Sequence, residues 1–247
     1  MKTKSHDAMG QLLWDYYDQQ DVTEIVERDD GYIDTGKIGP RIYFEDFKNW
    51  PAFERQAMKF ARGRVLDIGC GAGRVGLHLQ SKGHDVVGID NSPLAVKVCR
   101  VRGLKDIRLM PVTKLDSRLG MFDTIVMYGN NFGLMGSYRR AKWLLRRFFK
   151  MTGEQGRIIA QSVDPYKTDA PWHKRYHARN RKRGRMGGQI RIRIRHRDCI
   201  GNWFDYLLVS QKELTNIVND TGWRINRFID SDGPYYMAII DKLGRSQ

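Results

Sequence analysis

The chain has 247 residues, a formal net charge of +15 and an apolar fraction of 41%. This length supports a full hydrophobic core, and no apolar run approaches the roughly 20 residues of a membrane span. The polar N-terminus contains no apolar signal core, and the three cysteines (Cys70, Cys99 and Cys199) include no closely spaced pair. We therefore expect a cytoplasmic protein without a disulfide framework or a zinc site.

The positive charge is concentrated in one stretch of the sequence. Residues 138–197 contain 19 Lys and Arg side chains and three acidic ones, a net charge of +16, which leaves −1 for the rest of the chain. Such a basic zone indicates an anionic partner or an electrostatic funnel. The alternative is a solvated basic face.

The first fifty residues mix turn signals with aromatic side chains. We interpret residues 1–50 as a cap and residues 51–247 as the main domain. Within the cap, the pattern predicts a helix at 12–17 and a hairpin at 24–34 that turns at Asp30-Gly31. Pro51 then opens a helix to about residue 61, because proline is tolerated in the first helical turn.

Strand-like and helix-like segments alternate in the next part of the chain. Short apolar segments that predict strands lie at 64–68, 84–90, 106–110, 122–128 and 156–163. Segments that predict helices lie between them, at 73–82, 92–103 and 137–151. This alternation predicts a parallel sheet covered by helices on both faces.

Residues 165–209 break this alternation and are interpreted as an insertion. Its first part, 165–188, is polar and basic, and we expect a mobile loop over 180–188. Residues 189–197 then alternate strictly between isoleucine and arginine, which predicts a strand with an antiparallel partner at 203–209. After the insertion, Ser210 and Glu213 form a capping box for a helix to about residue 220. Two closing strands follow at 223–229 and 235–241.

A glycine-rich loop joins the first predicted strand of the main domain to a helix. It reads D-I-G-C-G-A-G from Asp67 to Gly73. Glycine lets the backbone turn sharply against a ligand, and the helix start favours anions. However, a carboxylate at Asp67 would repel a pyrophosphate and suits a ligand with an ammonium and a sulfonium. Asp90 ends the next strand, where a carboxylate accepts ribose hydroxyls.

The segments V-L-D-I-G-C-G-A-G and V-V-G-I-D-N-S-P resemble the first two motifs of the class I S-adenosylmethionine-dependent methyltransferases. The resemblance implies an α/β fold with a seven-stranded, mostly parallel Rossmann-like sheet and an antiparallel C-terminal hairpin. The cap and an inserted basic β-hairpin lid would be added to that fold. A Rossmann-like domain without methyl transfer, such as a dehydrogenase, is the alternative.

The resemblance also implies S-adenosylmethionine as the cofactor and assigns its binding residues. The loop residues Asp67, Gly69, Cys70, Gly71 and Gly73 would wrap its methionyl part. Asp90 would hold the ribose, and Asn91 and Ser92 would flank the adenine. Related enzymes often have an acidic residue after the third strand, whereas this chain has Met110-Pro111-Val112-Thr113. The adenine contact there falls to backbone groups or to Thr113.

Acceptor groups are expected after the fourth strand, where the chain reads Tyr128-Gly129-Asn130-Asn131-Phe132-Gly133. It lacks the N-P-P-Y type sequence of enzymes that methylate nucleobase amino groups. The G-N-N-F segment is similar to the G-N-S-F segment of glycine-type small-molecule N-methyltransferases. We take Tyr128, Asn130 and Asn131 as candidate catalytic residues, with an ordinary turn as the alternative.

Further candidates lie in the cap and the insertion. The arginine face, with Arg191, Arg193 and Arg195, is predicted to bind substrate unless it is the solvated side of an edge strand. His173 and His177 are spaced for one helix face, and we expect substrate contact or a general base rather than a metal site. Tyr16 and Tyr17 are predicted to fold over the ligand, with ordinary packing as the alternative.

The sequence leaves three functions open. The first is methyl transfer to nitrogen or oxygen of a small anionic molecule by in-line displacement. The second is methylation of tRNA or rRNA, with the basic zone binding phosphates. The third is a non-catalytic cofactor-binding or scaffold protein. No membrane partner is expected, and the oligomeric state is not predicted.

Overall fold

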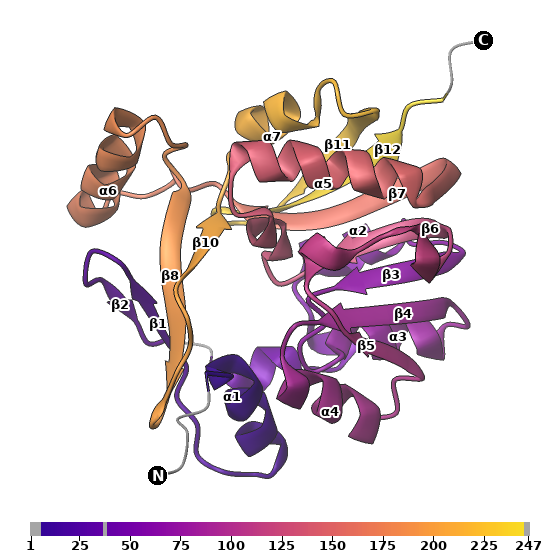
Figure 1. Cartoon of the computed structure of the whole chain (residues 1–247), viewed down its shortest axis with the longest axis horizontal. Helices are drawn as coiled ribbons and strands as arrows, with labels where there is room; N and C mark the ends of the chain where they lie inside the picture. Colours follow the sequence, from indigo (N-terminus) through magenta and orange to yellow (C-terminus); the bar gives the residue numbers. More distant parts are fainter. Residues whose placement is uncertain (1–5, 37–38, 245–247) are drawn as a thin grey trace.

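A computed structural model describes residues 6–36 and 39–244 and contains two sheets (Figure 1). The larger has seven strands in the order β11-β12-β7-β6-β3-β4-β5. Its strands are β3 (Arg64–Ile68), β4 (Asp85–Asp90), β5 (Asp106–Leu109), β6 (Phe122–Met127), β7 (Thr152–Val163), β11 (Trp223–Asp230) and β12 (Tyr235–Lys242). Strands β3 to β7 are parallel, and β12 is antiparallel to both β7 and β11. The predicted fold class is confirmed.

Helices cover both faces of this sheet. Alternate strand residues point to opposite faces, so Leu66 belongs to one hydrophobic core and Val65 to the other. The first core contains α5 (Tyr138–Lys150) and α7 (Gln211–Val218). The second contains α2 (Ala52–Met58), α3 (Arg74–Ser81) and α4 (Pro93–Val101). Short 3₁₀ helices complete the connections: η1 (Pro40–Tyr43), η2 (Phe47–Asn49), η3 (Val112–Lys114), η4 (Ser117–Leu119) and η5 (Asn131–Met135).

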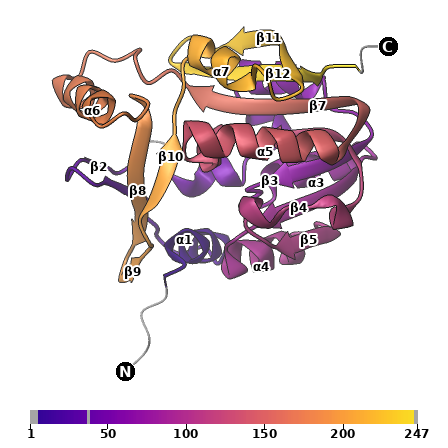
Figure 2. The same ribbon diagram turned by 45° about the horizontal axis from the view of Figure 1, so that its top comes forward.

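The smaller sheet joins segments far apart in the sequence. Its order is β10-β8-β1-β2, with β9 paired to β8. It contains β1 (Ile25–Arg28), β2 (Ile33–Asp34), β8 (Gln189–His196), β9 (Cys199–Ile200) and β10 (Phe204–Leu207). The predicted hairpins are present, but β8 pairs with β1 as well as β10, so it is not an edge strand. Figure 2 shows this sheet standing beside the larger one. Residue periodicity detects strands but not their partners, so this pairing was missed.

The first part of the insertion contains a helix where a polar loop was expected. Helix α6 (Pro171–Lys182) begins with proline at its first position. It has no broad apolar stripe and buries only Tyr176, His177 and Asn180, so its periodicity in the sequence is weak. The side-chain amide of Asn180 donates to the backbone oxygens of Gly187 and Gln189, at 3.0 and 2.8 Å. The prediction of a mobile loop over 180–188 is therefore wrong for its first residues, which are helical. Asn180 at this helical end also holds Gly187 and Gln189 through these hydrogen bonds.

Helix α1 (Ala8–Tyr17) connects the two sheets (Figure 1). It packs on α4 so closely that a Cβ atom on Gly10 would lie 2.2 Å from the Ser92 hydroxyl. It is also joined to β8 by buried Asp15, whose carboxylate lies 3.0 Å from Nε2 of buried His196. In the described part of the chain, no helix has the length and apolar character needed to cross a membrane.

Candidate cofactor and acceptor site

The glycine loop links β3 to α3 in a conformation that needs glycine. Gly69, Gly71 and Gly73 have φ angles of 68°, 55° and 81°. The amides of Gly69 and Cys70 both donate to the Ile89 carbonyl, at 2.9 and 3.1 Å. A Cβ atom on Gly69 would lie 2.7 Å from the side-chain nitrogen of Asn131. Only glycine therefore combines the left-handed backbone with this close approach.

Asp67 supplies a buried carboxylate directly before this loop. Its side chain is 2% exposed, and its Oδ2 atom has no hydrogen-bond partner among the described residues. Burial raises the pKa of Asp67 to about 7, and the nearby Asp90 charge adds to the shift, although the Gly76 amide opposes it. A buried acceptor oxygen is seldom left unpaired unless a ligand satisfies it. The site therefore fits a ligand that brings a positive charge, as an ammonium does.

Asp90 ties the end of β4 to the same loop. One carboxylate oxygen accepts from the Gly71 amide and the other from the Ser92 amide, both at 2.9 Å. Burial raises the pKa of Asp90 to about 6, against the lowering effect of these two amides. A carboxylate has about four lone-pair sites, so two remain for ribose hydroxyls.

The other predicted cofactor residues offer less from their side chains. The Cys70 thiol is buried 3.7 Å from the Cys99 sulfur, beneath the loop. The Ser92 hydroxyl caps α4 and donates to Asp7 at 2.9 Å. Asn91 beside it and Thr113 in η3 are both exposed. Cys70 and Ser92 are thus left with backbone contacts to a cofactor, whereas Asn91 and Thr113 have free surfaces.

Two asparagines follow β6 and have different roles. The Asn131 amide nitrogen donates to the carbonyls of Ile68 and Gly69, at 3.0 and 2.8 Å, so it holds the glycine loop. Asn130 has a left-handed φ of 62°, and its buried Oδ1 atom has no partner among the described residues. Unpartnered oxygens thus lie at the carboxyl ends of the neighbouring strands β3 and β6, where α/β sheets bind ligands.

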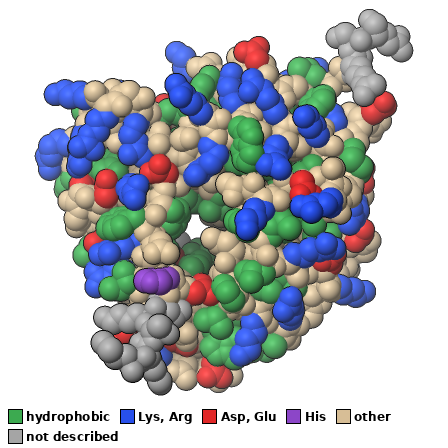
Figure 3. Space-filling model, in the orientation of Figure 1, with side chains coloured by type: hydrophobic (Ala, Val, Ile, Leu, Met, Phe, Trp, Pro, Cys, Tyr) green, Lys and Arg blue, Asp and Glu red, His purple; other side chains and the backbone are tan. Residues whose placement is uncertain are grey.

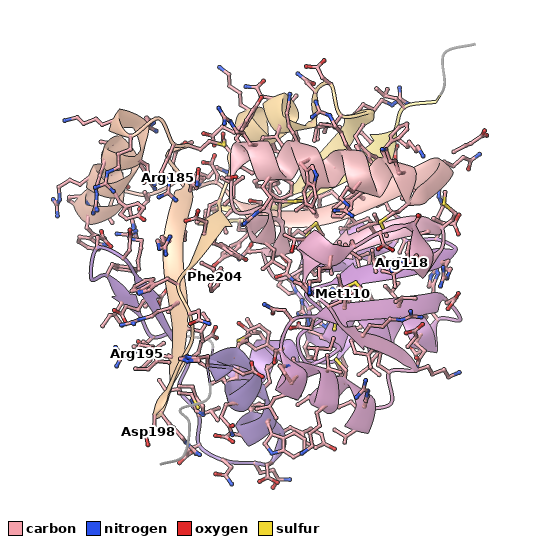
Figure 4. All side chains as sticks on the ribbon, viewed as in Figure 1. Met110, Arg118, Arg185, Arg195, Asp198 and Phe204 are labelled. Atoms are coloured by element: carbon pink, nitrogen blue, oxygen red, sulfur yellow. The ribbon has the colours of Figure 1, made fainter. Side chains whose placement is uncertain are left out.

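The smaller sheet faces these strand ends across a hollow that we call the chamber. Antiparallel partners share a face, which places Tyr206 beside Ile190, Phe204 beside Ile192, and Val26 beside Ile194. This face points to the glycine loop, because the Tyr206 hydroxyl donates to the Asn130 carbonyl at 2.6 Å. Figure 3 shows an opening between the two parts, and Figure 4 places Phe204 and Met110 on its opposite sides.

Comparison with known proteins agrees with this geometry. The family profile described as "Methyltransferase domain" matches residues 65–156. A solved S-adenosylmethionine-dependent methyltransferase from Bacteroides fragilis, in complex with S-adenosyl-L-homocysteine, is similar with a TM-score of 0.80 and 27% identity. The similarity covers 96% of this chain and 95% of that one. Residues 65–156 thus form a methyltransferase domain, and the chain has the fold of an S-adenosylmethionine-dependent methyltransferase. Its cofactor is S-adenosylmethionine, as predicted.

Two further relatives extend the comparison. The ubiquinone biosynthesis O-methyltransferase of Bordetella avium (strain 197N) is 35% identical over 68 residues. That match covers 25% of this chain and only 28% of the relative's length. A solved methyltransferase from Methanosarcina mazei, at 19% identity and a TM-score of 0.59, covers 76% of this chain and 96% of its own. The second shows the fold alone.

Helix α1 covers the cofactor loop of this methyltransferase, although not through its tyrosines. Leu13 lies 3.9 Å from the position that a Cβ atom on Gly71 would take. The Tyr16 ring instead packs on Phe44, with centroids 4.8 Å apart, and Tyr17 is 42% exposed. Tyr16 is therefore involved in ordinary packing, which was the alternative interpretation of these tyrosines.

Tyr128 is also turned away from the acceptor position. It is buried, and its hydroxyl donates to the Glu54 carbonyl at 3.2 Å, within the layer formed by α2. The structure therefore does not bring the Tyr128 hydroxyl to the acceptor position, where a catalytic role was predicted. Alternate residues of a strand point to the same face, and Tyr128, just after β6, continues the alternation of Val126. Both side chains therefore belong to the core on the α2 side of the sheet.

The arginine face of β8 points away from the chamber. Arg193 and Arg195 both bind Glu27, at 2.9 and 3.1 Å, and Arg191 is exposed. Glu27 lies opposite Arg193 in the register, on the face away from Ile190, Ile192 and Ile194. The structure therefore does not bring Arg191, Arg193 and Arg195, the predicted substrate contacts, to the chamber. The hairpin does cover the site, but with its isoleucine face.

The two histidines of α6 are not at the strand ends either. Helix α6 lies at the outer corner of the smaller sheet (Figure 1). Its His173 ring lies 2.9 Å from Arg28, and burial lowers the pKa of His177 to about 4. The structure therefore does not place His173 and His177, the candidates for substrate contact or a general base, beside the cofactor loop. Over residues 6–36 and 39–244, no three side chains of metal-ligating type gather into a site.

The sequence analysis missed three polar side chains of the chamber. Tyr206 contacts the loop after β6, whereas Glu24 and Tyr43 come from the cap and bind each other at 3.0 Å. Glu24 precedes β1 and shares the face of Val26, two residues along. Alternation in the predicted hairpin would have grouped Glu24 with Val26, but nothing in the sequence showed which face meets the cofactor.

Proposed function

We propose that this chain transfers the methyl group of S-adenosylmethionine to a nitrogen or oxygen atom of a small molecule held in the chamber. The observation that carries the proposal is the closure of the smaller sheet over the ends of β3 and β6. Apolar side chains with a few polar groups enclose the hollow between them, which is typical of a small-molecule site.

The residues of the chain act mainly by positioning. The bound cofactor supplies a methyl group on a positively charged sulfur. Asp67, Asp90 and the glycine loop would fix the two ends of that molecule, and Asn131 holds the loop itself. The acceptor must then lie in line with the breaking bond, which the chamber wall favours by restricting its orientation.

The structure does not support the anionic character expected of the substrate. That expectation rested on the arginine face of β8, which points outward. The ionisable side chains turned to the chamber are instead mostly acidic or phenolic: Glu24, Tyr43, Tyr206, Asp67 and Asp90. Two arginines lie near them, but Arg28 is paired with Asp30 and Arg74 with Glu54. A neutral or cationic acceptor fits these groups better.

RNA methylation is a second candidate, favoured by one surface feature. Lys and Arg side chains gather over α5 and α6 (Figure 3). On α6, Trp172 is 47% exposed and lines a surface hollow with Arg175, Arg179 and Tyr32. Exposed aromatic rings between basic side chains stack on bases and bind phosphates. This surface lies outside the chamber, however.

The test combines cofactor binding with methyl transfer. Calorimetry is expected to show S-adenosyl-L-homocysteine binding, and labelled S-adenosylmethionine is expected to label a metabolite pool but not total RNA. Labelled RNA, together with tRNA binding that weakens steeply with salt, would support the second candidate instead. A chain that binds cofactor and labels neither pool would fit the scaffold alternative.

A further inference from the structure

Glu24 stands apart from the other acidic side chains of the smaller sheet. It is half-buried, and among the described residues its carboxylate accepts a hydrogen bond only from the Tyr43 hydroxyl, which lies 3.0 and 3.2 Å from its two oxygens. Among the described residues, no Lys or Arg lies within ion-pair distance of it. A carboxylate has about four lone-pair sites, so several remain for another donor.

Tyr43 connects Glu24 to the cofactor loop. Tyr43 packs against a buried cluster of Leu13, Ala72, Ala95 and Val98, and Ala72 belongs to the glycine loop. The Glu24 charge contributes to the raised pKa of Tyr43 and of Tyr206, although burial is the larger cause for both. Glu24 therefore lies near the loop through Tyr43 and near the end of β6 through Tyr206.

The titratable groups around Glu24 leave its charge uncompensated. Tyr43 faces it from η1, Asp34 from β2 and Tyr206 from β10, while His196 of β8 reaches the neighbouring Thr23 carbonyl at 3.1 Å. Burial raises the pKa of Glu24, the Tyr43 hydrogen bond opposes the shift, and the Asp34 charge adds to it. A base whose pKa moves toward neutrality is better suited to accept a proton at physiological pH.

We propose that Glu24 is the general base of the reaction and that the acceptor is a neutral or cationic amine or hydroxyl compound with an apolar body. The inference rests on the proposed function. The apolar body would lie on Val26, Ile194 and Phe204, which share the chamber face, and its reactive group would lie between Glu24 and the Asn130 loop.

The transfer step balances without a further reactant. A hydroxyl, or an amine whose ammonium proton has first passed to Glu24, supplies the lone pair that bonds to the methyl carbon. The carbon–sulfur bond breaks with its electron pair remaining on sulfur. The acceptor's proton passes to the Glu24 carboxylate. The products are the methylated acceptor, S-adenosyl-L-homocysteine and protonated Glu24, which returns its proton to solvent.

The test compares two glutamates three residues apart. Glu24→Gln removes the base, whereas Glu27→Gln is the matched control on the opposite face, where Glu27 binds Arg193 and Arg195. Both variants are expected to bind S-adenosyl-L-homocysteine with wild-type affinity. Methyl transfer to the neutral and cationic fraction of a metabolite extract, separated by ion exchange, should fall about 100-fold in kcat for Glu24→Gln only.

A pH profile and a titration give independent readouts. Wild-type kcat should rise with pH through the pKa of Glu24 and then level off, and this rise should be absent in Glu24→Gln. Carboxyl ¹³C NMR should show a higher pKa for Glu24 than for Glu27.

Three results would overturn the inference: transfer confined to the anionic fraction, wild-type kcat in Glu24→Gln, or a loss that appears only in KM. In each of these the proposed methyl transfer itself still stands. Loss of S-adenosyl-L-homocysteine binding, or labelling of no fraction by the wild-type chain, would instead refute the proposed function and the inference with it.

Discussion

The two faces of the smaller sheet differ in what they do with charge. On the outer face, Glu27 is paired with Arg193 and Arg195. Burial alone would raise the pKa of Glu27, but hydrogen bonds from these arginines outweigh it and hold that pKa below its usual range. On the chamber face, Glu24 accepts a hydrogen bond from the Tyr43 phenol, and burial raises the pKa of Glu24.

This difference shows that charge density did not mark the substrate site. The basic stretch contributes paired arginines and an exposed basic helix, while the chamber is mostly apolar with a few acidic and phenolic groups. Exposed ion pairs contribute little to stability and keep a surface soluble. A half-buried carboxylate without a cationic partner, by contrast, lowers the stability of the fold, and such groups are common at catalytic sites.

Asp90→Ala should have the largest effect. It removes the partner of two backbone amides and the proposed ribose acceptor. Hydrogen bonds to a charged group contribute roughly 1.5–3 kcal/mol each, so affinity for S-adenosyl-L-homocysteine should fall about 100-fold. Asp205→Ala, which removes an ion pair to Arg185 away from the cofactor loop, is the control. Unchanged affinity of Asp90→Ala in calorimetry would contradict the ribose role.

Gly133→Ala should move the smaller sheet away from the cofactor side of the chamber. A Cβ atom there would lie 2.2 Å from the Tyr206 ring, so β10 must move away from the loop after β6. Overpacking of this kind costs about 2 kcal/mol, measurable as a lower denaturation midpoint. Methyl transfer should fall while S-adenosyl-L-homocysteine still binds. Gly153→Ala, where a Cβ atom meets nothing within 4 Å, is the control. Equal behaviour of the two variants would show that Tyr206 does not set the chamber.

Cofactor affinity should also depend on pH. Asp67 and Asp90 have pKa values raised to about 7 and about 6, chiefly by burial, and both must be ionised to bind an ammonium and a ribose. Affinity for S-adenosyl-L-homocysteine should therefore fall about twentyfold from pH 8 to pH 6. The ligand-free fold has the opposite dependence, because raised carboxyl pKa values stabilise it at low pH and that contribution is lost as pH rises through 6 to 7. A flat affinity profile in calorimetry would refute the ionised pair.

The sequence predicted the parallel sheet and the cofactor loop because both depend on local patterns. Strand β3 has the predicted bounds, and Ser92 and Ser210 cap the expected helices, since caps and alternation are written in neighbouring residues. The pairing of β8 with β1 joins residues 166 positions apart, as between Glu27 and Arg193, and no local pattern encodes it. Without that pairing, the inward face of β8 was undetermined, and the arginines were chosen over the isoleucines.

The candidate site divides in the same way. Asp67, Asp90 and the loop glycines lie where their motif placed them, and Asn131 turned out to hold the loop. Glu24 and Tyr43 belong to no motif, and they come near Tyr206 only because the cap folds back onto the insertion. Proximity created by tertiary packing has no signature in a single sequence.

The central claim is that the acceptor binds on the isoleucine face of β8 and not on its arginine face. Methyl-transfer rates of Ile194→Trp and Arg191→Trp test it most directly, because the first adds bulk inside the chamber and the second adds it outside. We predict that Ile194→Trp lowers transfer at least about tenfold, with S-adenosyl-L-homocysteine affinity unchanged, while Arg191→Trp has the wild-type rate. A normal rate in Ile194→Trp together with a strong loss in Arg191→Trp would contradict the account.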